Sequence, residues 1–235
     1  MFDHKPMHGI LATMTDRRSN LFMNFFSKYP ARVYKKGEMI IRPDDIPSGI
    51  FYIEKGYIRI YSITRDGQER LHIIYKNDEL FPLMWALQDI QKNLYYEALE
   101  DSILRKSSKE DFLQFIKSHN DGLFDVTNRL VVMFSTFSDR IDNLEITKAY
   151  PRLIARLLFL ATRFGIRKGE KVRLAAPITQ RDIAVSIAMT RETTSREFEV
   201  LEKKGIIGYK NHRIIINHLK KLKDELEISY EKERL

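Results

Sequence analysis

Arg191 begins a six-residue run that carries the side chains with the clearest chemistry in this sequence. The run reads Arg-Glu-Thr-Thr-Ser-Arg and ends at Arg196. A guanidinium group can donate two hydrogen bonds to O6 and N7 of guanine, and a carboxylate such as Glu192 can accept one from N4 of cytosine. An exposed helix with ordinary Arg–Glu pairs is the alternative. Because the run follows a helix cap, we expect it to reach base edges in DNA, with Thr194 and Ser195 on the same outward side.

Two helices separated by a short turn are predicted to position this run. Thr179 can cap the first helix and Thr190 the second, because a threonine hydroxyl can accept a hydrogen bond from a free N–H group of the first turn. Gly205 ends the second helix, and a short hairpin through Asn211 follows it. The predicted inward positions are Ile183, Ala184 and Ile187 on the first helix and Phe198 and Leu201 on the second. The pattern predicts a winged helix-turn-helix.

The charge of the chain is concentrated in its C-terminal part. The formal net charge is +8. Residues 1–145 hold 20 Lys and Arg against 21 Asp and Glu, whereas residues 146–235 hold 20 against 11, a balance of +9. A solvated basic surface is one interpretation, and a surface that binds a polyanion is the other. Together with the two helices, the charge favours double-stranded DNA as a partner.

A heptad-like repeat precedes this basic part. Seven positions are spaced 4, 3, 4, 3, 4 and 3 residues apart. A helix that packs only on its own domain needs a broader apolar face with a period of 3.6 residues, so the narrow seam favours a homodimer. The alternative is simple core packing. The predicted dimer interface comprises Leu123, Thr127, Leu130, Phe134, Phe137, Ile141 and Leu144. Pro151 suits the first turn of a further helix, so we expect a hinge near residues 144–150.

The region from Ala31 to about Leu104 has the pattern of short β-strands. Four β-rich runs, at residues 39–41, 50–53, 57–61 and 71–75, alternate with turns, and Asp66-Gly67 marks a hairpin. This spacing predicts a small antiparallel barrel or jelly roll. The predicted fold class is therefore α+β. We expect a β-roll domain at residues 1–120, a dimerisation helix at 121–146 and a winged helix-turn-helix domain at 147–235.

These features together resemble the family of the cyclic-AMP receptor protein and the fumarate–nitrate regulator, the Crp/Fnr family. The resemblance covers nearly the whole chain. The segments that carry it are 34–38, 52–61 and 66–69 in the β-rich region, the repeat from 123 to 144, and the run from 191 to 196. The resemblance implies a cytoplasmic transcription regulator without enzymatic activity, bound as a homodimer to a symmetric TGTGA-like site. It also implies that the β-roll is a sensor for an effector. RNA polymerase would be a further partner of an activator.

The resemblance also assigns residues to DNA. Arg191, Glu192 and Arg196 correspond to side chains that read bases in the cyclic-AMP branch. Candidates for phosphate contacts are Thr179, Arg181 and Thr190, with Lys210 and His212 in the predicted hairpin.

The predicted sensor departs from the pattern of cyclic-nucleotide binders. Those relatives carry Gly-Glu-Leu followed by an Arg-Ser pair, which holds the phosphate. Here Asp-Glu-Leu begins at residue 78, and Lys92-Asn93 lies near the Arg-Ser position. Lysine lacks the bidentate fork of arginine. Phe137-Ser138 stands where a Thr-Ser pair would contact adenine, and a phenylalanine would crowd a purine. We therefore expect no cyclic nucleotide, with binding of cyclic AMP through Lys92 as the alternative.

Other effectors stay open at this point. An uncharged or aromatic molecule could bind near the Phe-Pro-Leu-Met-Trp stretch from residue 81 to 85, or the stretch could be barrel core with no effector at all. The chain has no cysteine, which excludes a cysteine-ligated iron–sulfur cluster. His72 is the sole plausible haem ligand, but it suits a cross-strand partner better. The candidate effector pocket comprises Glu79, Leu80, Phe81, Trp85, Lys92, Asn93, Phe137 and Ser138.

Composition narrows the remaining classes of protein. With 235 residues and 43% hydrophobic residues, the chain can build one or two cores. No apolar run reaches the roughly 18 residues of a membrane span. The N-terminus shows no signal peptide, so we expect the protein to stay in the cytoplasm. Metal-dependent chemistry in a cupin-like barrel would need clustered ligands, but the six histidines are scattered. A cyclic-nucleotide module serving another protein would leave Arg191 and Arg196 unexplained.

Overall fold

The computed structural model describes residues 15–231, and these residues divide into two compact units. The first unit comprises residues 15–60 and 74–132, and the second comprises residues 61–73 and 133–231. Residues 61–73, which lie within the N-terminal region, are therefore grouped with the C-terminal part of the chain. The domain boundaries at 120 and 146 stay a prediction.

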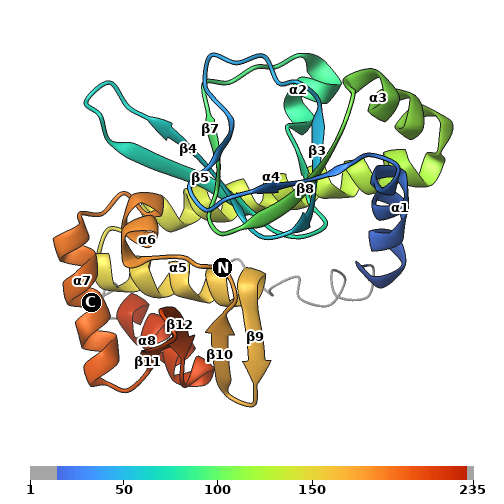
Figure 1. Cartoon of the computed structure of the whole chain (residues 1–235). Coiled ribbons are helices and arrows are strands. Elements are labelled where there is room, and N and C mark those ends of the chain that lie inside the picture. The colour runs from blue at the N-terminus through green and yellow to red at the C-terminus, as the bar shows by residue number, and fades with distance from the viewer. Residues whose placement is uncertain (1–14, 232–235) are drawn as a thin grey trace. The chain divides into compact units, whose positions relative to one another are not determined.

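The strands of the N-terminal region form two four-stranded sheets, with the orders β1-β8-β3-β6 and β2-β7-β4-β5. Figure 1 labels β3, β4, β5, β7 and β8 of this region. Within the first sheet all three neighbouring pairs are antiparallel. The strands are β1 (Ala31–Tyr34), β2 (Met39–Ile41), β3 (Ile50–Lys55), β4 (Ile58–Ile63), β5 (Glu69–Tyr75), β6 (Leu80–Phe81), β7 (Tyr95–Ala98) and β8 (Ser102–Ser107). The predicted β-roll is confirmed, and three of the four predicted strand runs begin within one residue of an observed strand.

Sequence patterns did not reveal the helices that cover this roll. They are α1 (Thr15–Ser27), α2 (Leu83–Gln88) and α3 (Lys109–Ser118). Phe22 and Phe26 of α1 and Phe112 of α3 are fully buried and belong to one core with Ile50 and Tyr52 of β3. The ring of Phe26 stacks on that of Tyr52 at 5.3 Å between centroids. Because β3 is covered on both faces, its first four residues are all buried.

The turn between β4 and β5 confirms the hairpin predicted from Asp66-Gly67. Gly67 has a φ of +79°, a conformation that glycine adopts without strain. The Thr64 N–H group donates to the Gln68 carbonyl at 2.9 Å, and the Gly67 N–H group donates to the Thr64 carbonyl at 2.9 Å. These bonds close the turn at the tip of the hairpin.

The long helix α4 (Asn120–Glu145) contains the predicted heptad repeat. Its next neighbour, α5 (Ala149–Phe164), begins after residues 146–148, so the helix break lies in the range predicted for a hinge. In the single chain Phe134 is 76% exposed and Ile141 61% exposed. Leu130 differs, because it packs partly against the core of the roll. The other exposed residues of the predicted seam are Leu123, Thr127, Phe137 and Leu144.

The C-terminal unit combines helices with a second sheet. Its elements are α5, β9 (Gly165–Lys168), β10 (Lys171–Leu174), α6 (Gln180–Ser186), α7 (Arg191–Lys203), β11 (Ile207–Lys210), β12 (Arg213–Ile216) and α8 (Leu219–Glu231), and the sheet has the order β11-β12-β10-β9. The sequence of residues 165–177 is typical of a basic loop, and this interpretation was wrong in part, because residues 165–174 form the β9–β10 hairpin. That hairpin pairs with β12 through Val172 and Ile216, both fully buried.

Three side chains join α5, α7 and α8 in what we call the interhelix cluster. Glu225 of α8 accepts hydrogen bonds from the Tyr150 hydroxyl at 2.8 Å and from Nζ of Lys204 at 2.6 Å. Lys204 also donates to the Tyr150 hydroxyl at 3.2 Å. The hydrogen bond to Glu225 raises the pKa of Lys204. The cluster therefore fixes the C-terminal end of α7 to the rest of the unit.

Candidate nucleic-acid interface

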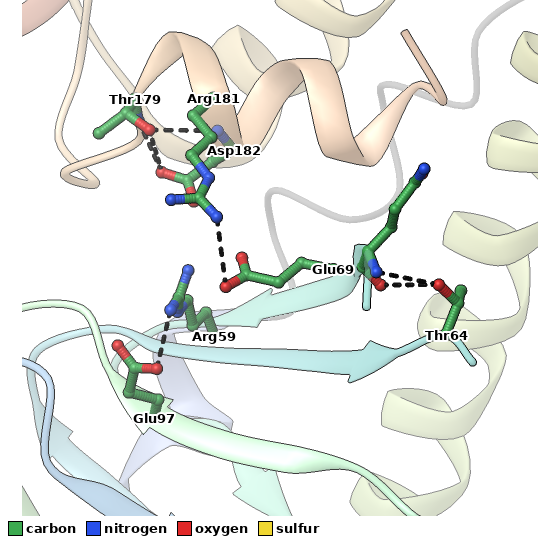
Figure 2. A network of polar contacts seen from close by, with 8 residues as sticks. Arg59, Thr64, Glu69, Glu97, Thr179, Arg181 and Asp182 are labelled. Atoms are coloured by element: carbon green, nitrogen blue, oxygen red, sulfur yellow. Dashed lines mark hydrogen bonds and ion pairs between the residues drawn. The ribbon is translucent and has the colours of Figure 1, made fainter. Parts of the chain in front are cut away.

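The start of α6 is fixed by a reciprocal pair of hydrogen bonds between Thr179 and Asp182 (Figure 2). The Asp182 N–H group donates to Oγ1 of Thr179 at 3.1 Å, and the Thr179 N–H group donates to Oδ2 of Asp182 at 2.8 Å. This capping box confirms the cap predicted at Thr179. Arg181 lies between the two capping residues, and its side chain is 67% exposed. The cap therefore sets the direction from which Arg181 leaves the helix.

The turn between α6 and α7 is compact. The Met189 N–H group donates to the Ala184 carbonyl at 3.0 Å, and Ala188 has a φ of +52°. Ile183, Ala184 and Ile187 are buried, as predicted for the inward face of the first helix. Thr190 caps the second helix, because its hydroxyl accepts a hydrogen bond from the Thr193 N–H group at 3.1 Å. Both predicted caps and the predicted helix pair are confirmed.

The polar run at the start of α7 lies partly outward and partly inward. Arg191, Glu192 and Arg196 are exposed, as the helical spacing predicts. The prediction for Thr194 was wrong, because this residue is fully buried and shares the inward face with Phe198. The reason is the helical period, which places residues 194 and 198 one turn apart on the same face. Three charged side chains thus remain on the outward surface of the first two turns.

The wing after α7 is a tight two-residue hairpin. Lys210 pairs with Arg213 across β11 and β12, and Asn211 and His212 between them have φ values of +50° and +58°. Such angles at both central positions are typical of a hairpin turn that matches the twist of the strands. Lys210 and His212 are exposed at this tip. The predicted hairpin through Asn211 is confirmed.

Two contacts that position the interface have no signal in the sequence. The Gln180 side-chain amide donates to the Tyr209 hydroxyl at 2.6 Å, which ties the start of α6 to the wing. Arg152 of α5 donates through Nε to the carbonyl of Ile146 at 2.7 Å and through Nη1 to that of Ile187 at 3.3 Å. Arg152 therefore connects the α4–α5 break to the end of α6. Gln180 and Tyr209 lie 29 residues apart, and Arg152 and Ile187 lie 35 apart, so periodicity and cap patterns could not reveal these contacts.

The residues predicted to form an effector pocket have different surroundings in the structure. Leu80 and Phe81 lie in the core of the roll. Glu79 accepts a hydrogen bond at 2.9 Å from the Lys76 N–H group in its own turn. The Trp85 ring of α2 lies under Nζ of Lys109, 5.0 Å from the ring centroid. The remaining members, Lys92, Asn93, Phe137 and Ser138, have exposed side chains.

Phe81 lies in an aromatic stack that we call the roll stack. Its ring centroid lies 5.2 Å from that of Phe51, 5.8 Å from that of Tyr75 and 5.3 Å from that of Tyr96. All three ring pairs are close to parallel, and Phe81 is fully buried. Burial raises the pKa of Tyr96 to about 12. The interpretation of Phe81 as barrel core is therefore confirmed.

His72 has the cross-strand partner that its position on a strand suggested. Its Nε2 atom lies 2.8 Å from the Ser62 hydroxyl, between β5 and β4. Among residues 15–231, no group of three or more His, Cys, Asp or Glu side chains could hold a metal ion. Over the same residues, no helix has the length and apolar composition needed to cross a membrane.

Two family models match this chain, one over the N-terminal β-roll and one over the C-terminal helix-turn-helix. The cyclic nucleotide-binding domain matches residues 31–119, and the Crp-like helix-turn-helix domain matches residues 151–225. Their combination decides the family. This chain belongs to the Crp/Fnr family of transcription regulators. The Crp-like helix-turn-helix domain includes α6, α7 and the wing.

Individual Crp/Fnr relatives match over most of their length. The cyclic AMP receptor protein of Thermus thermophilus is 24% identical over 200 residues, which cover 85% of this chain and 86% of the relative. The anaerobic regulatory protein of Bacillus subtilis is 22% identical over 211 residues, 89% of each chain. The curated relatives are regulators of transcription and not enzymes.

Solved structures share the fold at low sequence identity. A mutant of CooA from Carboxydothermus hydrogenoformans has a TM-score of 0.72 and 19% identity, over 86% of this chain and 90% of that one. FixK2 from Bradyrhizobium japonicum has a TM-score of 0.70 and 20% identity, over 83% and 96%. The predicted α+β architecture of β-roll, long helix and winged helix-turn-helix is thus confirmed for a Crp/Fnr regulator.

Proposed function

We propose that this regulator binds as a homodimer to a two-fold symmetric DNA site with TGTGA-like half-sites. Arg191 and Arg196 would donate to guanines, and Glu192 would accept from a cytosine. The observation that carries the proposal is the exposure of these three charged side chains on the first two turns of α7, while Phe198 and Thr194 anchor the opposite face. The N-terminal part of a recognition helix is the part that reaches base edges in the major groove.

Phosphate contacts on either side of α7 would set the register of the protein on DNA. The exposed candidates lie at the start of α6, in the turn before α7 and on the wing after α7. Contacts of this kind supply affinity without sequence information. The proposed residues are Thr179, Arg181, Thr190, Lys210 and His212. The excess of positive charge in residues 146–235 supports this assignment.

Dimerisation would pair two copies of α4. Phe134, Phe137, Ile141 and Leu144 are between 38% and 76% exposed in the single chain. A row of large apolar side chains at coiled-coil spacing is unfavourable in water and is stabilised by a second copy of the same helix. A symmetric dimer would place the two recognition helices about 34 Å apart, one turn of DNA. The relatives support this assembly, since homodimers are typical of them.

For the sensor we propose that no cyclic nucleotide binds. The roll stack buries the rings of Phe51, Phe81 and Tyr96 in the core, with the ring of Tyr75 stacked on that of Phe81. Lys92 has an exposed side chain, so it offers no desolvated partner for a phosphate. The match of residues 31–119 to a cyclic nucleotide-binding domain favours one second candidate, a cyclic-AMP-responsive regulator that uses Lys92.

Selection of bound DNA from a random pool tests the proposed function. We expect the purified full-length protein to enrich two-fold symmetric sites with TGTGA-like halves, without added nucleotide. Selection with cyclic AMP present should return the same sites with the same enrichment. Enrichment of no symmetric site would refute the DNA assignment. Enrichment that depends on cyclic AMP would refute the effector proposal and favour the second candidate.

A further inference from the structure

An ion pair in the second unit joins the β4–β5 hairpin to the first helix of the helix-turn-helix (Figure 2). Nη2 of Arg181 lies 3.6 Å from Oε1 of Glu69. Glu69 is the first residue of β5, and its side chain is 25% exposed, whereas that of Arg181 is 67% exposed. The carboxylate is therefore more buried than the guanidinium group that it contacts.

The hairpin that carries Glu69 is also fixed to α4. Nη1 of Arg140, in the C-terminal half of α4, donates to the carbonyl of His72 at 2.8 Å. The ring of the same histidine contacts Ser62 on β4 at 2.8 Å. Glu69 and His72 lie three residues apart on β5. One short strand thus touches the proposed dimerisation helix at one residue and the DNA-binding unit at another.

We propose that Glu69 is an autoinhibitory group that competes with a DNA phosphate for the guanidinium of Arg181. The inference rests on the proposed function, in which Arg181 contacts the phosphate backbone. A carboxylate and a phosphate present similar oxygens to the planar fork of arginine, so one guanidinium group serves either of them. Binding DNA then requires the Glu69–Arg181 pair to break.

The cost of breaking the pair sets the size of the effect. Arg181 is mostly exposed, and exposed ion pairs at this distance contribute modestly. Removing the competing carboxylate should therefore lower the dissociation constant for DNA roughly two- to fivefold. The effect should be similar on every sequence, because a phosphate contact carries no base information.

The β4–β5 hairpin also allows a movement of α4 to break the Glu69–Arg181 ion pair. A displacement of α4 that moves Arg140 would pull on β5 at His72, and Glu69 would move with the strand. Separation of Glu69 from Arg181 would then free the guanidinium group for DNA. The β4–β5 hairpin thereby transmits a change at α4 to the DNA affinity.

The test measures DNA affinity of the full-length protein by fluorescence anisotropy, on the selected site and on an unrelated duplex. Glu69→Gln removes the carboxylate charge with little change in shape, and Glu69→Ala is a second variant. Asp66→Asn is the matched control, because it removes the same charge from the tip of the same hairpin. We expect both Glu69 variants to bind both duplexes about two- to fivefold more tightly, and Asp66→Asn to bind as the wild type does.

The combination with Arg181→Ala separates competition from general charge effects. Arg181→Ala should weaken binding, and Glu69→Gln should give no gain in that background. A gain of equal size with and without Arg181 would overturn the inference, as would a loss on Arg181→Ala with no gain on Glu69→Gln. If Arg181→Ala leaves DNA binding unchanged, the proposed phosphate contact of Arg181 is refuted, and the inference about Glu69 is refuted with it. Melting temperatures within a few degrees of the wild type would show that each variant is folded.

Discussion

Replacing Phe134 with aspartate tests whether α4 pairs with a second copy. Complete burial of a phenylalanine side chain is worth about 1.5–3 kcal/mol. Phe134 is 76% exposed in the single chain, so covering it contributes about 1–2 kcal/mol per protomer. A two-fold axis doubles this contribution to about 2–4 kcal/mol, which is roughly a 30- to 1,000-fold change in the dimer dissociation constant. Aspartate adds the cost of carrying a carboxylate into an apolar seam.

Sedimentation equilibrium at micromolar protein checks this prediction. We expect the wild type to have the mass of a dimer, and Phe134→Asp and Ile141→Asp to have the mass of a monomer with little affinity for the symmetric site. Ser135→Asp is the matched control, because it places the same charge on an exposed position outside the repeat. Unchanged mass for both seam variants would refute the argument from spacing and exposure.

Three further predictions concern the interface, the sensor and stability. Arg181→Ala should weaken binding to every duplex and flatten the dependence of log affinity on log salt by about one unit; a loss confined to some sequences would contradict a phosphate role. Cyclic AMP should change neither Trp85 fluorescence nor DNA binding, and saturable quenching that disappears in Lys92→Ala would contradict this. Glu225→Gln should remove about 1 kcal/mol from the free energy of urea unfolding through the interhelix cluster, while Glu227→Gln, exposed on the same helix, should have little effect.

Local patterns predicted the recognition helix well. The cap at Thr190 and the exposure of Arg191, Glu192 and Arg196 follow from hydrogen-bonding groups and a period that act within a few residues. The same period also places Thr194 inside, one turn before Phe198, and the outward assignment of Thr194 overlooked this. The helix itself was predicted in the right place, but the face on which Thr194 lies was assigned wrongly.

Features that depend on distant residues could not be predicted. Whether the segment at 165–174 is a loop or a hairpin depends on pairing with β12, more than 40 residues later. The hydrogen bond from Arg152 to Ile187 joins residues 35 positions apart, and the ion pair between Glu69 and Arg181 joins residues 112 positions apart. No local periodicity records such contacts, because they arise only when separate elements pack.

The effector region shows the same limit. From the sequence alone, Phe81 could line a ligand pocket or belong to the barrel core, because an apolar run suits both places. In the structure Phe81 is part of the core, and the rings of Phe51, Tyr75 and Tyr96, which come from three other strands, contact it only in the folded roll. Lys92 likewise suited a phosphate by its position in sequence, but its side chain is exposed.

The affinity of wild type and Glu192→Ala for a panel of single-base variants of the selected site tests the central claim most directly. Base reading by α7 predicts that Glu192→Ala loses preference at one base pair of each half-site, by about 1–3 kcal/mol, and keeps the preferences at all others. Lys203→Ala, near the far end of the same helix, is the matched control and should keep every preference. Equal weakening on all sites, or an unchanged pattern of preferences, would contradict the claim that Glu192 reads a base.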